Sequence, residues 1–166
     1  MTAIHIVQLA YKVTDAKAAA LEWASHLGAG PFFVSENIPL EEVYYQGKLA
    51  SLDHTSAYGW SGGHMIELVQ QNCDTPSVFS QRANGLHHCA YFAADLDAEL
   101  ARLAAVGYAT AMQANTKSGV RFAFVETDLG HYFEIYQDHP TLRAFYATVE
   151  QAAEVWDGSE PLRSFS

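Results

Sequence analysis

A duplicated segment places the strongest constraint on what this chain can fold into. The stretch GHMIELVQ at residues 63–70 reappears as GHYFEIYQ at residues 130–137, with glycine, histidine, glutamate and glutamine at matching positions. Residues 85–108 likewise repeat the strand-like run, acidic helix cap and closing glycine of residues 5–30. The opening segments are 80 residues apart and the closing ones 67, so the first repeat carries 13 extra residues. The chain is therefore expected to contain two copies of one folding unit.

Each repeat has the residue pattern of a strand, a helix and three further strands. In the first repeat, strands are expected at 4–13, 31–36, within 41–60 and at 63–70, and a helix between the cap Asp15 and Gly28. In the second, a strand and a helix are expected within 85–108, followed by strands at 108–113, 119–127 and 130–137. Region 41–60 alternates like one or two strands of a hairpin, which can absorb the extra residues.

These patterns predict an α+β fold. Two tandem βαβββ modules are expected to form a curved mixed sheet around a shared cleft, which is where small ligands tend to bind. The single domain of 166 residues divides into module one (4–72), a linker (73–84), module two (85–138), and a C-terminal helix and tail (139–166). The last helix should begin near Pro140 and pack on the outside of the sheet through a face of apolar residues, namely Leu142, Phe145, Tyr146 and Val149.

Composition limits the class of partner. The formal charge of −10 disfavours nucleic acid and acidic membrane surfaces, because a phosphate-binding surface needs clustered lysine and arginine. No apolar run is long enough to cross a bilayer, and the first residues lack the pattern of an export signal, so a cytoplasmic location is expected. The two cysteines, Cys73 and Cys89, are interpreted as reduced thiols. A small molecule is the expected partner.

Strand parity selects four polar residues that can carry chemistry. Side chains an even number of residues apart share one face of a strand, so Glu67 points away from His64, Glu134 away from His131, and His88 away from His87. The first and last strands of each module then contribute one polar residue apiece, and these are Gln8, Glu67, His88 and Glu134. Their neighbours are apolar, and no lysine or arginine lies near them in these strands. Buried carboxylates need a compensating charge, which a divalent cation would supply.

We therefore predict that Gln8, Glu67, His88 and Glu134 bind one divalent metal ion. An imidazole, two carboxylates and an amide oxygen suit Zn, Ni, Co, Mn or Mg. The alternatives are that the two glutamates face solvent, as a single strand glutamate usually does, or that the four residues are relics of a lost metal site. The other histidines are more simply interpreted as surface or hydrogen-bonded core residues.

The order and spacing of VQLAYKVTD, HMIELV, GLHHCAYFAADLDAEL and GHYFEIYQ resemble the vicinal oxygen chelate superfamily, which includes glyoxalase I, methylmalonyl-CoA epimerase, ring-cleaving dioxygenases and bleomycin resistance proteins. The glyoxalase I and epimerase branch is the most similar. Members place metal ligands on the first and last strands of each module, which implies the same four residues. Most members have histidine at the first position, where this chain has Gln8.

The resemblance implies an isomerase, epimerase or lyase that moves a proton next to a metal-polarised carbonyl, with Glu134 as the base and Glu67 as its partner. A metal-free protein that binds a small molecule is the alternative, and a ring-cleaving dioxygenase is disfavoured because it needs two histidines and one carboxylate. Few arginines are available for glutathione or coenzyme A, and only Arg121 lies in an expected inner strand. We therefore expect an apolar carbonyl substrate. The resemblance and exposed sheet edges also favour a homodimer.

Overall fold

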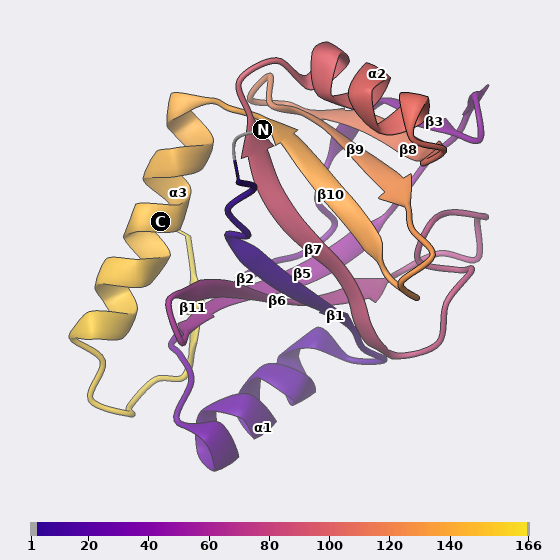
Figure 1. The fold of residues 1–166 in the computed structure, drawn as a ribbon. Helices are drawn as coiled ribbons and strands as arrows, with labels where there is room; N and C mark the ends of the chain where they lie inside the picture. The colour runs from indigo at the N-terminus through magenta and orange to yellow at the C-terminus, as the bar shows by residue number, and fades with distance from the viewer. Residues whose placement is uncertain (1–2, 166) are drawn as a thin grey trace.

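Residues 3–165 are described by a computed structural model, in which one curved sheet of eleven strands is accompanied by three helices (Figure 1). The strands are β1 (Gln8–Lys12), β2 (Phe32–Ser35), β3 (Leu40–Tyr45), β4 (Lys48–Leu49), β5 (His54–Ser61), β6 (His64–Gln71), β7 (Gly85–Ala93), β8 (Thr110–Thr116), β9 (Arg121–Glu126), β10 (Tyr132–Gln137) and β11 (Leu162–Ser164). The helices are α1 (Ala16–Leu27), α2 (Leu96–Ala105) and α3 (Pro140–Glu154).

The two sequence repeats fold as related units that share one sheet. Strand order is β11-β2-β5-β6-β1-β7-β10-β9-β8-β3-β4. In both units the opening strand runs parallel to the closing strand, β1 beside β6 and β7 beside β10. The units meet where β1 pairs with β7 in antiparallel orientation. The predicted α+β fold with two βαβββ modules in a curved mixed sheet is confirmed.

The extra residues of the first repeat form a hairpin that crosses to the second unit. β3 and β4 pair with each other, but β3 also pairs with β8, whereas β5 pairs with β2 and β6. Region 41–60 thus contains a hairpin and a separate strand that belongs to a different part of the sheet. Val43 from β3 packs with Phe122 and Phe124 of the second unit, so apolar burial fixes this crossing.

Two helices cover the outer face of the sheet, and their ends follow from the sequence. The Asp15 carboxylate caps α1 by accepting from the Ala18 N–H, and Asp95 caps α2 by accepting from the Ala98 N–H. α1 ends at Gly28, whose positive φ of 62° favours glycine. Both caps and the closing glycine of α1 agree with the predicted boundaries.

The predicted position of the C-terminal helix was wrong. α3 does not pack on the outer face, because Tyr146 and Val149 lie in one cluster with Phe33 and Met65 on the face of β6 that also carries Glu67. α3 thus lies against β5 and β6 (Figure 1), and Leu142, Phe145 and Tyr146 from its apolar face line the cavity beside Glu67. The chain then returns as β11, which pairs with β2.

Short strands occupy both edges of the sheet. β11 has three residues and β4 has two. Short edge strands offer little backbone for pairing with a second sheet, so the edges of this sheet give little support to the predicted homodimer. Within residues 3–165, no helix has the length and apolar character required to span a membrane.

Candidate metal centre

Four adjacent strands in the middle of the sheet bring the four predicted residues together. β6, β1, β7 and β10 lie side by side in this order (Figure 1) and carry Glu67, Gln8, His88 and Glu134, respectively. The register places Ala10 beside both Glu67 and His88, and Ala90 beside both Gln8 and Glu134. Small alanines between the polar residues leave room for their side chains to converge.

The four side chains form one buried hydrogen-bonded cluster. His88 Nε2 lies 3.2 Å from Glu67 Oε2 and 3.0 Å from Glu134 Oε2. Gln8 Nε2 donates to the same oxygens, at 2.8 Å and 3.2 Å. Exposed fractions are 1% for Gln8 and His88, 5% for Glu67 and 4% for Glu134. The alternative that the glutamates face solvent is therefore excluded.

The surroundings shift the pKa values of the Glu67 and Glu134 carboxyl groups in opposite directions. Burial alone would raise the pKa of Glu67, but hydrogen bonds from His88 and Ser56 outweigh it and lower the pKa. Ser56, buried on β5, donates to Glu67 Oε1 at 2.6 Å. Burial raises the pKa of Glu134, and the charge of Glu67 adds to this effect while His88 opposes it. Glu134 is therefore the stronger base of the pair.

The ring of His87 lies on the same side of β7 as that of His88, whereas strand parity predicts opposite sides. Ala10 pairs with His88 and Tyr11 with Leu86, so His87 is an extra residue in β7 at a bulge. A bulge interrupts the alternation of side chains along a strand, which turns the His87 ring towards the same side as His88. The Nδ1 atoms of the two rings lie 2.9 Å apart.

The contact between His87 and His88 fixes the orientation of the His88 ring. His87 Nε2 lies 3.1 Å from the Val78 carbonyl oxygen, so it carries a proton and donates to that oxygen. Burial, and then the charge of His88, lower the pKa of His87 to about 3, so the ring is neutral and its Nδ1 is an acceptor. His88 must then donate from Nδ1, which directs Nε2 at the carboxylates. Burial alone would lower the pKa of His88, but Glu134 and Glu67 raise it to about 9.

Gln8 is oriented by the C-terminal helix. The Tyr146 hydroxyl donates to Gln8 Oε1 at 2.6 Å, which leaves the amide nitrogen facing the centre. An amide ligand binds a metal through oxygen, so coordination by Gln8 requires a rotation that exchanges the two amide atoms. Tyr146 could remain a partner after that rotation, because its hydroxyl can also accept from the amide nitrogen.

The donor set fits a divalent cation. Ligand atoms of Glu67, His88 and Glu134 all lie within 4.8 Å of one another. One neutral imidazole and two carboxylates balance a charge of +2, and their apolar surroundings favour such neutralisation. Glu67, His88 and Glu134 would hold the ion directly, and Gln8 would join them after rotation of its amide.

A small cavity opens onto the cluster. Its volume is about 100 Å³, and much of its wall is apolar, with Leu52, Phe79, Phe122, Phe124, Leu142 and Phe145. His54 also lines it, and although the residue is only 8% exposed, its Nδ1 has no hydrogen-bond partner among the described residues. A buried nitrogen without a partner is available to a ligand.

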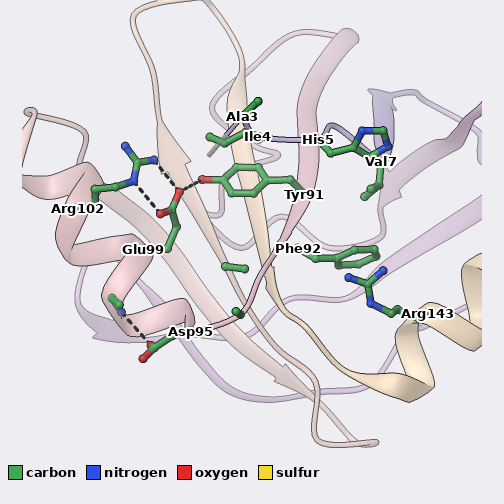
Figure 2. Close-up of a pocket in the computed structure, with 13 residues that line it drawn as sticks. Ala3, Ile4, His5, Val7, Tyr91, Phe92, Asp95, Glu99, Arg102 and Arg143 are labelled. Carbon is green, nitrogen blue, oxygen red and sulfur yellow. Dashed lines mark hydrogen bonds and ion pairs between the residues drawn. The ribbon is translucent and has the colours of Figure 1, made fainter. Parts of the chain in front are cut away.

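A larger hollow lies elsewhere in the described structure. It has a volume of about 750 Å³ and is lined by Tyr91, Glu99, Arg102 and Arg143 (Figure 2). Glu99 accepts from Tyr91 at 2.7 Å and from Arg102 at 2.7 Å and 2.8 Å. Arg143 is paired with Asp138. Because these charges neutralise one another, the hollow lacks the converging free groups of the buried cluster.

Sequence reasoning missed four residues around the cluster, namely Ser56, His87, His54 and Tyr146. Ser56 and His54 share a face of β5, but alternation alone does not distinguish a buried polar residue from an exposed one. The bond between Tyr146 and Gln8 joins residues 138 positions apart, and no local pattern reveals it.

Residues 7–124 match the Glyoxalase/Bleomycin resistance protein/Dioxygenase superfamily. The chain belongs to this superfamily. The resemblance seen in the repeated motifs is thus confirmed. No protein among the curated sequences matches the chain.

Solved structures share this fold at low sequence identity. A hypothetical protein from Bacillus halodurans is 16% identical with a TM-score of 0.60, and the match covers 83% of this chain and 96% of that one. Methylmalonyl-CoA epimerase from Mycobacterium tuberculosis is 19% identical with a TM-score of 0.57, covering 87% and 97%. The Streptomyces coelicolor epimerase, bound to 2-nitronate-propionyl-CoA, is 14% identical with a TM-score of 0.56, covering 84% and 97%.

Proposed function

We propose that the protein is a divalent-metal-dependent isomerase, epimerase or lyase that moves a proton next to the carbonyl of a small substrate. The convergence of Glu67, His88 and Glu134 in a buried cluster beside a cavity carries this proposal. The cofactor would be one ion of Zn, Ni, Co, Mn or Mg. Such an ion, when bound, polarises a carbonyl and makes the adjacent C–H more acidic.

Glu134 and Glu67 are assigned the proton transfers. Burial raises the pKa of Glu134, which favours its carboxylate as the group that removes the proton. Glu67 lies on β6, on the far side of β1 and β7 from β10. In an epimerase Glu67 would return a proton to the opposite face of the carbon, whereas in an isomerase Glu134 would return it to a neighbouring atom. His88 and Ser56 hold Glu67 in place for this role.

Solvent deuterium exchange tests the proposal. The protein is loaded with Zn, Ni, Co, Mn or Mg in deuterium oxide, and loss of the C–H signal next to the carbonyl is followed by NMR for a panel of small ketones and α-hydroxyketones. We expect metal-dependent exchange that Glu134→Gln abolishes while circular dichroism shows an intact fold. Exchange that persists at the wild-type rate in Glu134→Gln would place the base elsewhere.

One observation favours a second function, that of a metal-free binding protein. Without a metal, protonated His88 and the Gln8 amide already satisfy the two carboxylates. A protein that takes up none of the five ions, yet binds an apolar ligand in the cavity, would support this alternative. A ring-cleaving dioxygenase remains disfavoured, because the cluster offers one histidine and two carboxylates.

The predicted homodimer and cytoplasmic location remain proposals. All four predicted ligands come from one chain, so the centre does not require a second copy. Sedimentation at micromolar concentration would decide the oligomeric state.

A further inference from the structure

The walls of the ligand cavity carry a narrow range of chemical groups. Besides the cluster and the apolar residues, the lining contains His54, Thr116 and the hydroxyl groups of Tyr58, Tyr136 and Tyr146. Burial raises the pKa of each of these tyrosines well above its usual value, and burial lowers the pKa of His54. These groups are therefore neutral near pH 7 and can offer hydrogen bonds without charge.

The approach to the cavity also lacks positive charge. An outer hollow of about 500 Å³ shares Ile38, Tyr58, Thr116 and Phe145 with the cavity, so the two spaces adjoin. Glu36 is the charged residue in its lining, and it is already paired with Lys17 at 2.8 Å. Among the described residues, no lysine or arginine lines either space.

Three of the arginines outside these two spaces are committed to surface pairs. Arg121, expected on an inner strand, pairs with Asp97 through bonds of 3.1 Å and 2.7 Å. Arg102 and Arg143 pair with Glu99 and Asp138. Four basic residues adjoin lining residues in sequence, and none of them lines the cavity or the outer hollow. Arg121 and Arg143 are held in the pairs just described, and the other two are Lys117 and Arg163.

We infer that the site takes a small, uncharged, largely apolar carbonyl compound, and not a substrate carried on coenzyme A or glutathione. The inference rests on the proposed metal centre. Two carboxylates and a divalent ion sum to zero net charge, so a carboxylate or phosphate on the substrate would be desolvated without a protein cation to pair with. The volume of the cavity also indicates a small substrate. An apolar cavity of about 150 Å³ admits one benzene ring, and this cavity, at about 100 Å³, is smaller.

A matched pair of metal-binding probes tests the inference. Butanohydroxamic acid and succinic monohydroxamic acid share the same two chelating oxygens and differ by a methyl in place of a carboxylate. Binding of each to the cobalt-loaded protein is measured by calorimetry and by the visible spectrum of cobalt. We expect the butanohydroxamic acid to bind at least about tenfold more tightly, and coenzyme A at millimolar concentration to leave the spectrum unchanged.

Two outcomes separate this inference from the proposed function. If cobalt binds but the acidic probe binds as well as the neutral one, or coenzyme A displaces the probe, the substrate inference is overturned and the metal centre stands. If cobalt does not bind at all, the proposed function fails and the inference falls with it. The double variant Lys117→Ala/Arg163→Ala should keep the same preference for butanohydroxamic acid over succinic monohydroxamic acid. A change in this preference would show that Lys117 or Arg163 interacts with the charge of the bound molecule.

Discussion

Replacing His87 by phenylalanine isolates the residue that orients His88. Phenylalanine keeps an aromatic ring on Phe79, whose centroid lies 4.5 Å from that of His87, but removes both ring nitrogens. The donor at His88 Nδ1 and the carbonyl of Val78 then lose their partners, which are 2.9 Å and 3.1 Å away. Each buried group left without a partner costs about 1–3 kcal/mol in the free energy of unfolding.

Metal affinity should fall as well. Loss of the group that orients a histidine ligand typically weakens metal binding by about 10–100-fold, which corresponds to about 1.4–2.8 kcal/mol. Calorimetric titration with zinc measures the affinity, and urea denaturation of the metal-free protein measures the stability. His64→Phe is the matched control, because within residues 3–165 the His64 side chain has one hydrogen-bond partner, the Gly62 carbonyl oxygen.

The variant His87→Asn separates the two effects. Its side-chain oxygen can occupy a position close to that of Nδ1 and accept from His88, but it cannot reach the Val78 carbonyl. We expect metal affinity close to that of the wild type, with stability still reduced. A folded His87→Phe variant that binds zinc with wild-type affinity would refute the orienting role.

Three further outcomes follow from the structure. Metal uptake at pH 7 should release about one proton per chain, because His88 has a pKa of about 9 in the metal-free protein and must lose its proton to bind the ion. Calorimetry in buffers of different ionisation enthalpy measures the number of protons released, and a value of zero would contradict the prediction. In the metal-free protein, His87 should account for a loss of about 1.4 kcal/mol of stability per pH unit between about pH 6.5 and about pH 3, because the unfolded state protonates His87 below 6.5 whereas the folded state does so only near pH 3. Urea melts should show a slope weaker by this amount for His87→Phe. Gly59→Ala should lower stability by about 1–3 kcal/mol, since its Cβ would lie 2.6 Å from buried Phe32; unchanged thermal stability would contradict that contact.

Local patterns and duplication were sufficient to predict the repeated strands and helices and the four central residues, but not β11 or the division of residues 41–60 into β3, β4 and β5. The matched Glu67 and Glu134 required only strand parity, because β6 and β10 are regular and each runs parallel to the opening strand of its own repeat. Gln8 and His88 followed from the same symmetry. The sheet then brings the four side chains together because β1 and β7, the opening strands of the repeats, pair in the middle.

Features that depend on pairing between distant segments could not be predicted. The bulge at His87 arises from the register between β1 and β7, and parity assumes that no such bulge exists. The crossing of β3 to β8 depends on apolar contacts between the two units. α3 was assigned its apolar face correctly, but a helical pattern does not say which face of the sheet that helix covers.

Anomalous scattering from a crystal grown with zinc tests the central claim most directly. We predict one peak per chain, about 2.0–2.3 Å from ligand atoms of Glu67, His88 and Glu134, with the Gln8 amide oxygen turned towards it and its nitrogen towards Tyr146. Absence of a peak at this cluster at full zinc saturation, or a peak coordinated by other residues instead, would contradict the assignment of Gln8, Glu67, His88 and Glu134 to one metal centre.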